Sequence, residues 1–217
     1  MIFVDGLQLE NAREPDFAFT TKSTKRITAE EILHTKFKLK DTIEIPVSGE
    51  QHTFIVEHIR QLDNGRKKVY FVAKNIVGKS SMIPERINSF LDDFEANMPR
   101  EIVNVMEPIE HKRFGFEFTR KLNLLSSANI RDRDGYDGYD DILFRGFETE
   151  IDRCKGYNGK TNWWWLCDLW ERSRRISRFT NFNYVYPTGY IGIGVASGDY
   201  GVVPSFSIIQ KVLENIA

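Results

Sequence analysis

The sequence predicts a single α+β domain built from antiparallel strands with two or three helices. Three observations lead to this prediction. Strand-like alternation occurs both early and late in the chain, amphipathic helical patterns lie between, and no internal repeat or low-complexity linker divides the 217 residues. The polar, aperiodic residues 1–25 are expected to form an N-terminal arm or irregular lead-in, and residues 26–217 the domain.

The composition excludes several classes of protein. Hydrophobic residues make up 41% of the chain, which is enough apolar material for a sizeable core. No apolar run approaches the ~18 residues that span a bilayer, and Met1 to Glu10 lacks the pattern of a signal peptide. The formal net charge of −1 argues against binding nucleic acid over the whole surface. We therefore expect a soluble protein with no membrane partner.

Two cysteines, Cys154 and Cys167, are too few for a disulfide framework or a four-ligand zinc site. Reduced thiols in a protein made in a reducing compartment are the favoured interpretation. A single bridge, or redox chemistry that uses both thiols, is the alternative.

The first elements are predicted from local signals. The capping box Thr28–Glu31 predicts a short helix that ends near His34. Three strands follow, with turn signals between them, at 42–47, 52–59 and 68–73. Alternation in the second strand places Phe54, Val56 and His58 on one face. Together these strands should form a meander.

Two helices are expected next. Pro84 occupies a first helical turn, and apolar residues recur at i, i+3, i+4 and i+7 from Ile87 to Phe94. A second helix should start at Pro99 and end before Pro108.

The rest of the chain is predicted from turn signals and periodicity. We expect a strand at 114–122, a loop at 131–141, a helix at 142–154 whose Leu143, Phe147 and Ile151 face inward, and a turn at 156–161. Strands should follow from Trp163 onward and close with 202–209. The glycine-rich segment 189–198 continues into strand pattern, which favours a twisted strand over a phosphate-binding loop.

Basic and aromatic residues interleave in one segment, a pattern that can bind single-stranded nucleic acid, sugars or a protein surface. Three adjacent tryptophans cannot all face inward on a strand, so Trp163 and Trp165 should share one face and Trp164 the other. A mainly buried tryptophan run is the alternative. The predicted binding surface consists of Trp163, Trp165, Trp170, Arg172, Arg174, Arg175 and Arg178, with Tyr136 and Tyr139 of the preceding loop.

Metal and catalytic motifs are sparse. Asp132, Asp134 and Asp137 lie in an acidic, glycine-containing loop, where carboxylates could hold Ca²⁺, but the spacing is not that of an EF-hand. A solvated loop is the favoured alternative. Even numbering places His52 and His58 on one strand face, where a metal pair is conceivable, although surface or edge-strand histidines are the favoured alternative. The sequence contains neither His-Glu-x-x-His nor Gly-x-Ser-x-Gly.

Five short patterns occur in a fixed order along the chain. They are 37–45, 87–99, 122–127, Trp164-Trp165-Leu166 with 182–189, and 201–206. In this order they resemble the DUF6273 family over about residues 26–209. The resemblance implies a C-type-lectin-like or formylglycine-enzyme-like fold, phage-associated relatives and no established catalytic activity.

The chain departs from the family pattern at two places. Cys167-Asp168 stands where the family has Arg-Ser, and Val203 where it has Arg. Any role of those arginines is therefore not carried over. The joint loss leads to the hypothesis that apolar packing replaces a linked structural pair.

The resemblance leads us to expect a non-enzymatic phage virion protein: a capsid decoration, a neck or tail component, or a receptor-binding module. It would be made in the bacterial host cytoplasm and reside in the virion. Its partners would be other virion proteins, its own copies or a cell-surface glycan, with no cofactor apart from the Ca²⁺ alternative. Two alternatives stay open: an oxidase-like enzyme that uses Cys154 and Cys167, and a nucleic-acid-binding regulator that uses residues 163–178.

Overall fold

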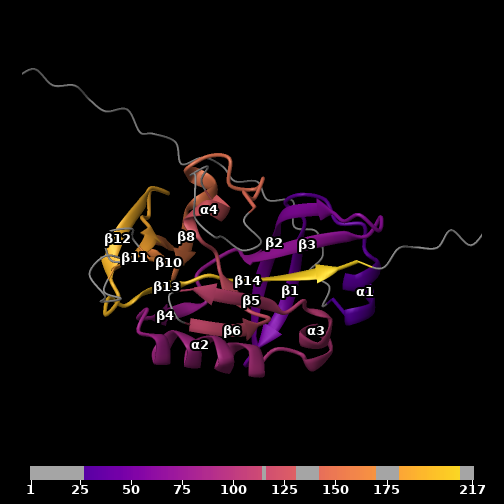
Figure 1. The fold of residues 1–217 in the computed structure, drawn as a ribbon, viewed down its shortest axis with the longest axis horizontal. Helices are drawn as coiled ribbons and strands as arrows, with labels where there is room; N and C mark the ends of the chain where they lie inside the picture. The colour runs from indigo at the N-terminus through magenta and orange to yellow at the C-terminus, as the bar shows by residue number, and fades with distance from the viewer. Residues whose placement is uncertain (1–26, 114–115, 131–141, 170–180, 211–217) are drawn as a thin grey trace, which may run out of the picture.

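The computed structural model describes residues 27–113, 116–130, 142–169 and 181–210. The predicted N-terminal arm and the whole of the predicted loop 131–141 lie outside these residues. Within them the chain forms an α+β fold of mostly antiparallel sheets (Figure 1). The helices are α1 Ala29–His34, α2 Pro84–Ala96, α3 Arg100–Val105 and α4 Ser127–Ile130, with a short 3-10 turn, η2, at Ile151–Arg153.

Two five-stranded sheets carry the fold. The first has the order β1-β2-β3-β14-β7, with bounds Thr42–Val47, Glu50–Gln61, Lys67–Ala73, Pro204–Ile209 and Asn123–Leu124. The second has the order β12-β11-β10-β13-β4, with bounds Ile191–Val195, Asn181–Val185, Trp164–Leu169, Tyr200–Val202 and Gly78–Ser80. Two hairpins complete the described strands: β5 Ile109–Arg113 with β6 Phe116–Arg120, and β8 Lys155–Tyr157 with β9 Lys160–Asn162.

The early elements match the sequence prediction. The capping box of α1 is complete, because the Thr28 hydroxyl accepts from Glu31 N while the Glu31 carboxylate accepts from Thr28 N. Strands β1 to β3 form the expected meander. Helix α2 buries Ile87, Leu91 and Phe94, as its spacing predicts.

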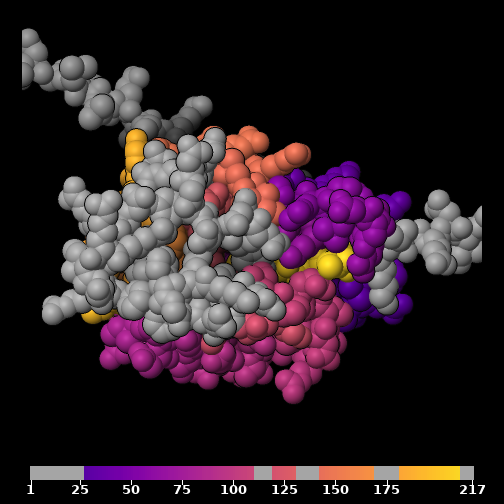
Figure 2. All heavy atoms as spheres, in the orientation of Figure 1, coloured from indigo at the N-terminus to yellow at the C-terminus, as the bar shows by residue number. Residues whose placement is uncertain are grey.

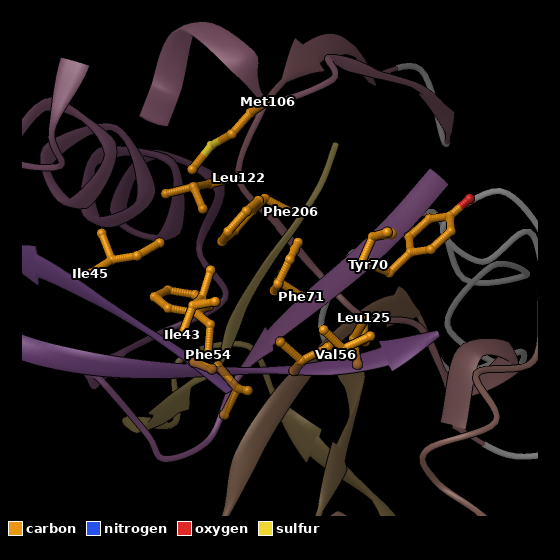
Figure 3. Close-up of a cluster of buried hydrophobic side chains, with 14 of the residues drawn as sticks. Ile43, Ile45, Phe54, Val56, Tyr70, Phe71, Met106, Leu122, Leu125 and Phe206 are labelled. Atoms are coloured by element: carbon orange, nitrogen blue, oxygen red, sulfur yellow. The ribbon is translucent and has the colours of Figure 1, made fainter. Parts of the chain in front are cut away.

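The main core lies against the first sheet and joins distant parts of the chain. Strand β14 pairs with β3, so Phe206 lies opposite Phe71 and stacks on it with ring centres 5.0 Å apart. Figure 3 shows Phe54, Val56 and Leu122 packed around this pair. Burial of such large aromatic side chains stabilises the fold by roughly 1.5–3 kcal/mol each. The C-terminal strand is therefore part of the same unit as the meander.

Strand β2 contains a bulge that the alternating pattern did not reveal. Val56 lies opposite Phe71 and His58 opposite Tyr70, so Glu57 is an extra residue between them. Directly opposed residues share a face of a sheet, while successive residues alternate. His58 therefore lies on the Tyr70 face, and the prediction that it shares the face of Val56 is wrong.

The predicted helix at 142–154 is not present. Of its three expected inward residues only Phe147 is buried, whereas Leu143 and Ile151 are exposed. Two backbone groups of this segment bond to other elements: Phe144 N donates to Asn129 O, and Gly146 N donates to Glu57 O at 2.8 Å. These tertiary hydrogen bonds replace the helical ones, and only the η2 turn forms.

Two predicted segments are hairpins or parts of hairpins. The turn expected at 156–161 lies within the β8–β9 hairpin, where Asn158 and Gly159 both have positive φ, as a tight hairpin turn requires. The strand expected at 114–122 is β6, paired with the unpredicted β5.

Candidate binding surface

Aromatic side chains in or directly beside β10, β11 and β13 of the second sheet form one cluster, here called the aromatic cluster. The indole of Trp163 stacks on Tyr184 with ring centres 5.6 Å apart and planes at 20°. It makes edge contacts with Tyr186 at 5.6 Å and Tyr200 at 5.1 Å. Trp165 lies 4.5 Å from Tyr200. Such offset and edge-to-face contacts fix each ring against its neighbours.

Two glycines of β12 explain how the rings lie against the sheet. Gly192 lies opposite Tyr184, so both belong to the face of the aromatic cluster. A Cβ at Gly192 would collide with the Tyr186 ring, and one at Gly194 would lie 2.9 Å from ring atoms of Tyr184 and Tyr200. The absence of side chains at these positions therefore makes room for the tyrosines.

The cluster has a buried part and an exposed part. Helix α2 and its neighbours cover Trp165, which is fully buried and whose Nε1 donates to Ser80 O at 2.8 Å. Trp163 and Tyr186 each keep 37% of their surface exposed. Tyr184 lies beneath them, where burial and a hydrogen bond with Tyr186 raise its pKa.

Trp163, which directly precedes β10, and Trp164 and Trp165 within it alternate between two faces as predicted. Trp163 and Trp165 both contact Tyr184, while Trp164 is buried in the main core and its Nε1 donates to Arg153 O at 2.9 Å. Trp165 was predicted to contribute to a binding surface, and this is corrected because its side chain is inaccessible. The other predicted surface residues, Trp170, Arg172, Arg174, Arg175, Arg178, Tyr136 and Tyr139, lie outside the described residues, as do Asp132, Asp134 and Asp137.

A buried polar network joins the described residues that flank segments 131–141 and 170–180. Asp168 is fully buried, and its carboxylate accepts from Ser127 N at 2.8 Å, Ser127 Oγ at 2.6 Å and Asn183 Nδ2. Asn129 Nδ2 donates to Ile142 O at 2.9 Å, which links the residues on either side of segment 131–141. The roots of segments 131–141 and 170–180 are therefore held together.

Two departures from the DUF6273 pattern, Cys167 and Val203, lie at positions where the family has Arg. Val203 is buried in the main core. Cys167 is half-buried and packs against the buried cluster that contains Trp165. Asp168 stands where the family has Ser and accepts the three hydrogen bonds of the network. The hypothesis that apolar packing replaces a linked pair of arginines stays a prediction.

A second polar cluster lies between the β2 bulge and segment 144–157. Lys40 Nζ donates to Glu57 Oε2 at 2.8 Å and also to Gly146 O. Lys155 is buried, with its Nζ 5.4 Å from the centre of the Phe147 ring. Burial raises the pKa of Glu57, and the charges of Lys155 and Lys40 only partly offset this. These polar contacts connect segment 144–157 to strand β2 of the first sheet.

Lys155 is expected to make folding stability depend on alkaline pH. Burial lowers its pKa from 10.5 to about 8, against the opposing effect of Glu57. Between these values the unfolded chain binds more protons than the folded one, so the free energy of unfolding rises with pH. From the pKa difference we expect a rise of about 2 kcal/mol between about pH 8 and pH 10 in urea titrations. The K155M variant should lack this rise, and equal slopes in both proteins would contradict the assignment.

The histidines and cysteines form no metal or disulfide site in the described part of the chain. His52 makes an edge contact with Phe94, whereas His58 stacks on Phe144, so the predicted metal pair lacks the shared face that it needs. No group of three or more His, Cys, Asp or Glu side chains that could hold a metal ion occurs among residues 27–113, 116–130, 142–169 and 181–210. Neither Cys154 nor Cys167 forms a disulfide, and burial together with the charge of Glu150 raises the pKa of the Cys154 thiol.

The tyrosines of the aromatic cluster are the residues that the sequence prediction missed. Their signal was the spacing Tyr184-Val185-Tyr186 in one strand and Gly192-Ile193-Gly194 in the next, which puts rings and glycines on a common face. Tyr200 carries no comparable local signal.

None of the helices within the described residues is long and apolar enough to cross a bilayer. Comparison of the chain with models of protein families, with curated proteins and with solved structures finds no match. The resemblance to the DUF6273 family stays a prediction from the quoted motifs.

Proposed function

We propose that this chain is a non-enzymatic binding protein of a phage particle, and that the aromatic cluster holds its partner. The single observation that carries the proposal is the pair of exposed rings, Trp163 and Tyr186, held rigidly on a sheet by rings beneath them. Large aromatic side chains of this kind dominate the energy of many interfaces. Because neighbouring rings already fix their orientation, binding would cost little side-chain entropy.

The location on a particle rests on the resemblance to the DUF6273 family. The C-type-lectin-like fold that it implies would present loops from a rigid scaffold, and the joined roots of segments 131–141 and 170–180 support such an arrangement. Other virion proteins, further copies of the chain and a cell-surface glycan are the proposed partners. With each of these three partners the protein would bind a surface and catalyse no reaction.

The test uses purified phage particles and the double variant Trp163→Ala/Tyr186→Ala. Mass spectrometry of the particles should detect the chain. Removal of two central aromatic contacts should weaken binding of the purified protein to particles lacking it, or to host cells, at least 10-fold, since hot-spot residues contribute about 2 kcal/mol or more.

The matched control is Leu39→Ala, whose side chain is 38% exposed just before the first sheet and outside the aromatic cluster. It should bind as the parent does. If mass spectrometry does not detect the chain in purified particles, the result would contradict the proposed place in the virion. Binding that is unchanged in the double variant, with the fold intact by circular dichroism, would contradict the role of the cluster.

A further inference from the structure

Strand β12 differs from the other strands that end the two large sheets. Natural sheets protect their edges with charges, prolines or very short strands. Strand β1 contains Glu44 and Pro46, β7 has two residues, and β4 has three residues with Lys79 at its centre. Strand β12 has five residues, Ile-Gly-Ile-Gly-Val, with neither charge nor proline.

The side chains of β12 are exposed to an unusual degree for aliphatic residues. Ile193 keeps 42% of its surface exposed and Val195 55%, and both project from the face opposite the aromatic cluster. The pairing with β11 continues without a bulge from Ile191 to Val195. Figure 1 shows β12 at the outer end of its sheet. A regular, uncharged edge of this kind is a template for a further strand.

The hydrogen-bonding groups of the same residues face outward. Tyr186 N donates to Tyr190 O at 2.7 Å, which makes these two a hydrogen-bonded pair of the β11–β12 hairpin. In an antiparallel ladder such pairs alternate with pairs whose N–H and C=O point away from each other. The alternation directs the main-chain groups of Ile191, Ile193 and Val195 to the outer side of β12.

The strand is also symmetric about its centre. Around Ile193, β-branched residues stand at 191 and 195 and glycines at 192 and 194. A two-fold axis through Ile193 would place Ile193 opposite itself and Ile191 opposite Val195. Every β-branched side chain would then meet another on one face, and every glycine would meet a glycine on the other.

From this edge we propose that β12 pairs antiparallel with β12 of a second copy of this chain, which joins two five-stranded sheets into one continuous sheet. The interface is independent of the partner held by the aromatic cluster, which lies on the other face. The self-matching sequence favours a second copy over a different protein, because the strand offers no charge that would select one.

The first test is the oligomeric state by analytical ultracentrifugation at about 100 μM, where an interface of micromolar affinity is saturated. The parent protein should be a dimer, and Ile193→Lys a monomer, because two like charges would face each other across the axis. The matched control Ile193→Val keeps a β-branched side chain and should remain a dimer. A monomeric parent, or a dimeric Ile193→Lys variant, would overturn the proposal.

A second test does not depend on weakening the interface. In a background with Cys154 and Cys167 replaced by serine, Ile193→Cys should form an intermolecular disulfide with oxidised glutathione. Opposed residues in a hydrogen-bonded pair have Cα atoms about 5.5 Å apart, which a disulfide can span. Lys79→Cys, at the opposite edge of the same sheet, should not crosslink. Equal crosslinking of the two variants would speak against pairing through β12.

Discussion

Replacement of Asp168 by alanine is expected to lower the free energy of unfolding by about 4 kcal/mol. The carboxylate accepts from three donors, Ser127 N, Ser127 Oγ and Asn183 Nδ2, and Asp168 and both donor residues are buried. Without it each donor loses its partner in a site that water does not reach, and each such loss costs roughly 1–3 kcal/mol. Urea denaturation of the two proteins measures the difference.

The matched control for this prediction is Ser127→Ala. It removes one hydroxyl together with its hydrogen bond and leaves the carboxylate with two donors, so it should cost about 1 kcal/mol. If the alanine variants of Asp168 and Ser127 are equally stable, the carboxylate does not hold the network together. The comparison therefore tests whether Asp168 holds together the residues that flank segments 131–141 and 170–180.

The elements that sequence alone predicts are those determined by neighbours in the chain. The capping box of α1 needs only Thr28 and Glu31, and the apolar face of α2 needs only its own spacing. The β2–β3 hairpin follows from a turn signal, since Gly65 adopts the positive φ that the turn requires. In each case the hydrogen bonds and the buried face lie within a few residues.

The sequence predictions that are wrong have a common physical cause, because tertiary contacts decide the structure at those places. A spacing of four in segment 142–154 favours a helix, but Phe144 N and Gly146 N find acceptors on α4 and β2. The bulge at Glu57 places a carboxylate where Lys40 and Lys155 can offset its burial, and those lysines lie 17 residues before it and far after it in the chain. No local pattern contains this information.

The candidate binding surface shows the same difference between features set by local sequence and features set by tertiary contacts. The alternation of the tryptophans follows from strand geometry and was predicted, whereas the burial of Trp165 depends on α2 and on Ser80, 85 residues away. Faces of a strand can thus be predicted from sequence, while their accessibility is decided by what packs on them.

Alanine at Gly189 is expected to destabilise the fold by about 3 kcal/mol or more, because two costs add. Gly189 adopts φ +86° in the turn between β11 and β12, a conformation that costs an L-residue roughly 1–2 kcal/mol. An added Cβ would also overlap the carbonyl oxygen of Glu150, which is backbone and cannot rotate away. Thermal and urea unfolding would measure the loss.

Gly159 provides a control that separates the two costs. It has φ +77° in the β8–β9 turn, and a Cβ there would meet no atom within 4 Å. Alanine at Gly159 should therefore lose only the conformational part, about 1 kcal/mol. If both alanine variants lose the same free energy of unfolding, the backbone at residue 189 can move away from Glu150 at no cost. A larger loss of stability at Gly189 would show that the β11–β12 turn is held against η2. Arg153 Nη1 of that element also donates to Gly189 O at 3.1 Å. This contact would then set where β12 starts.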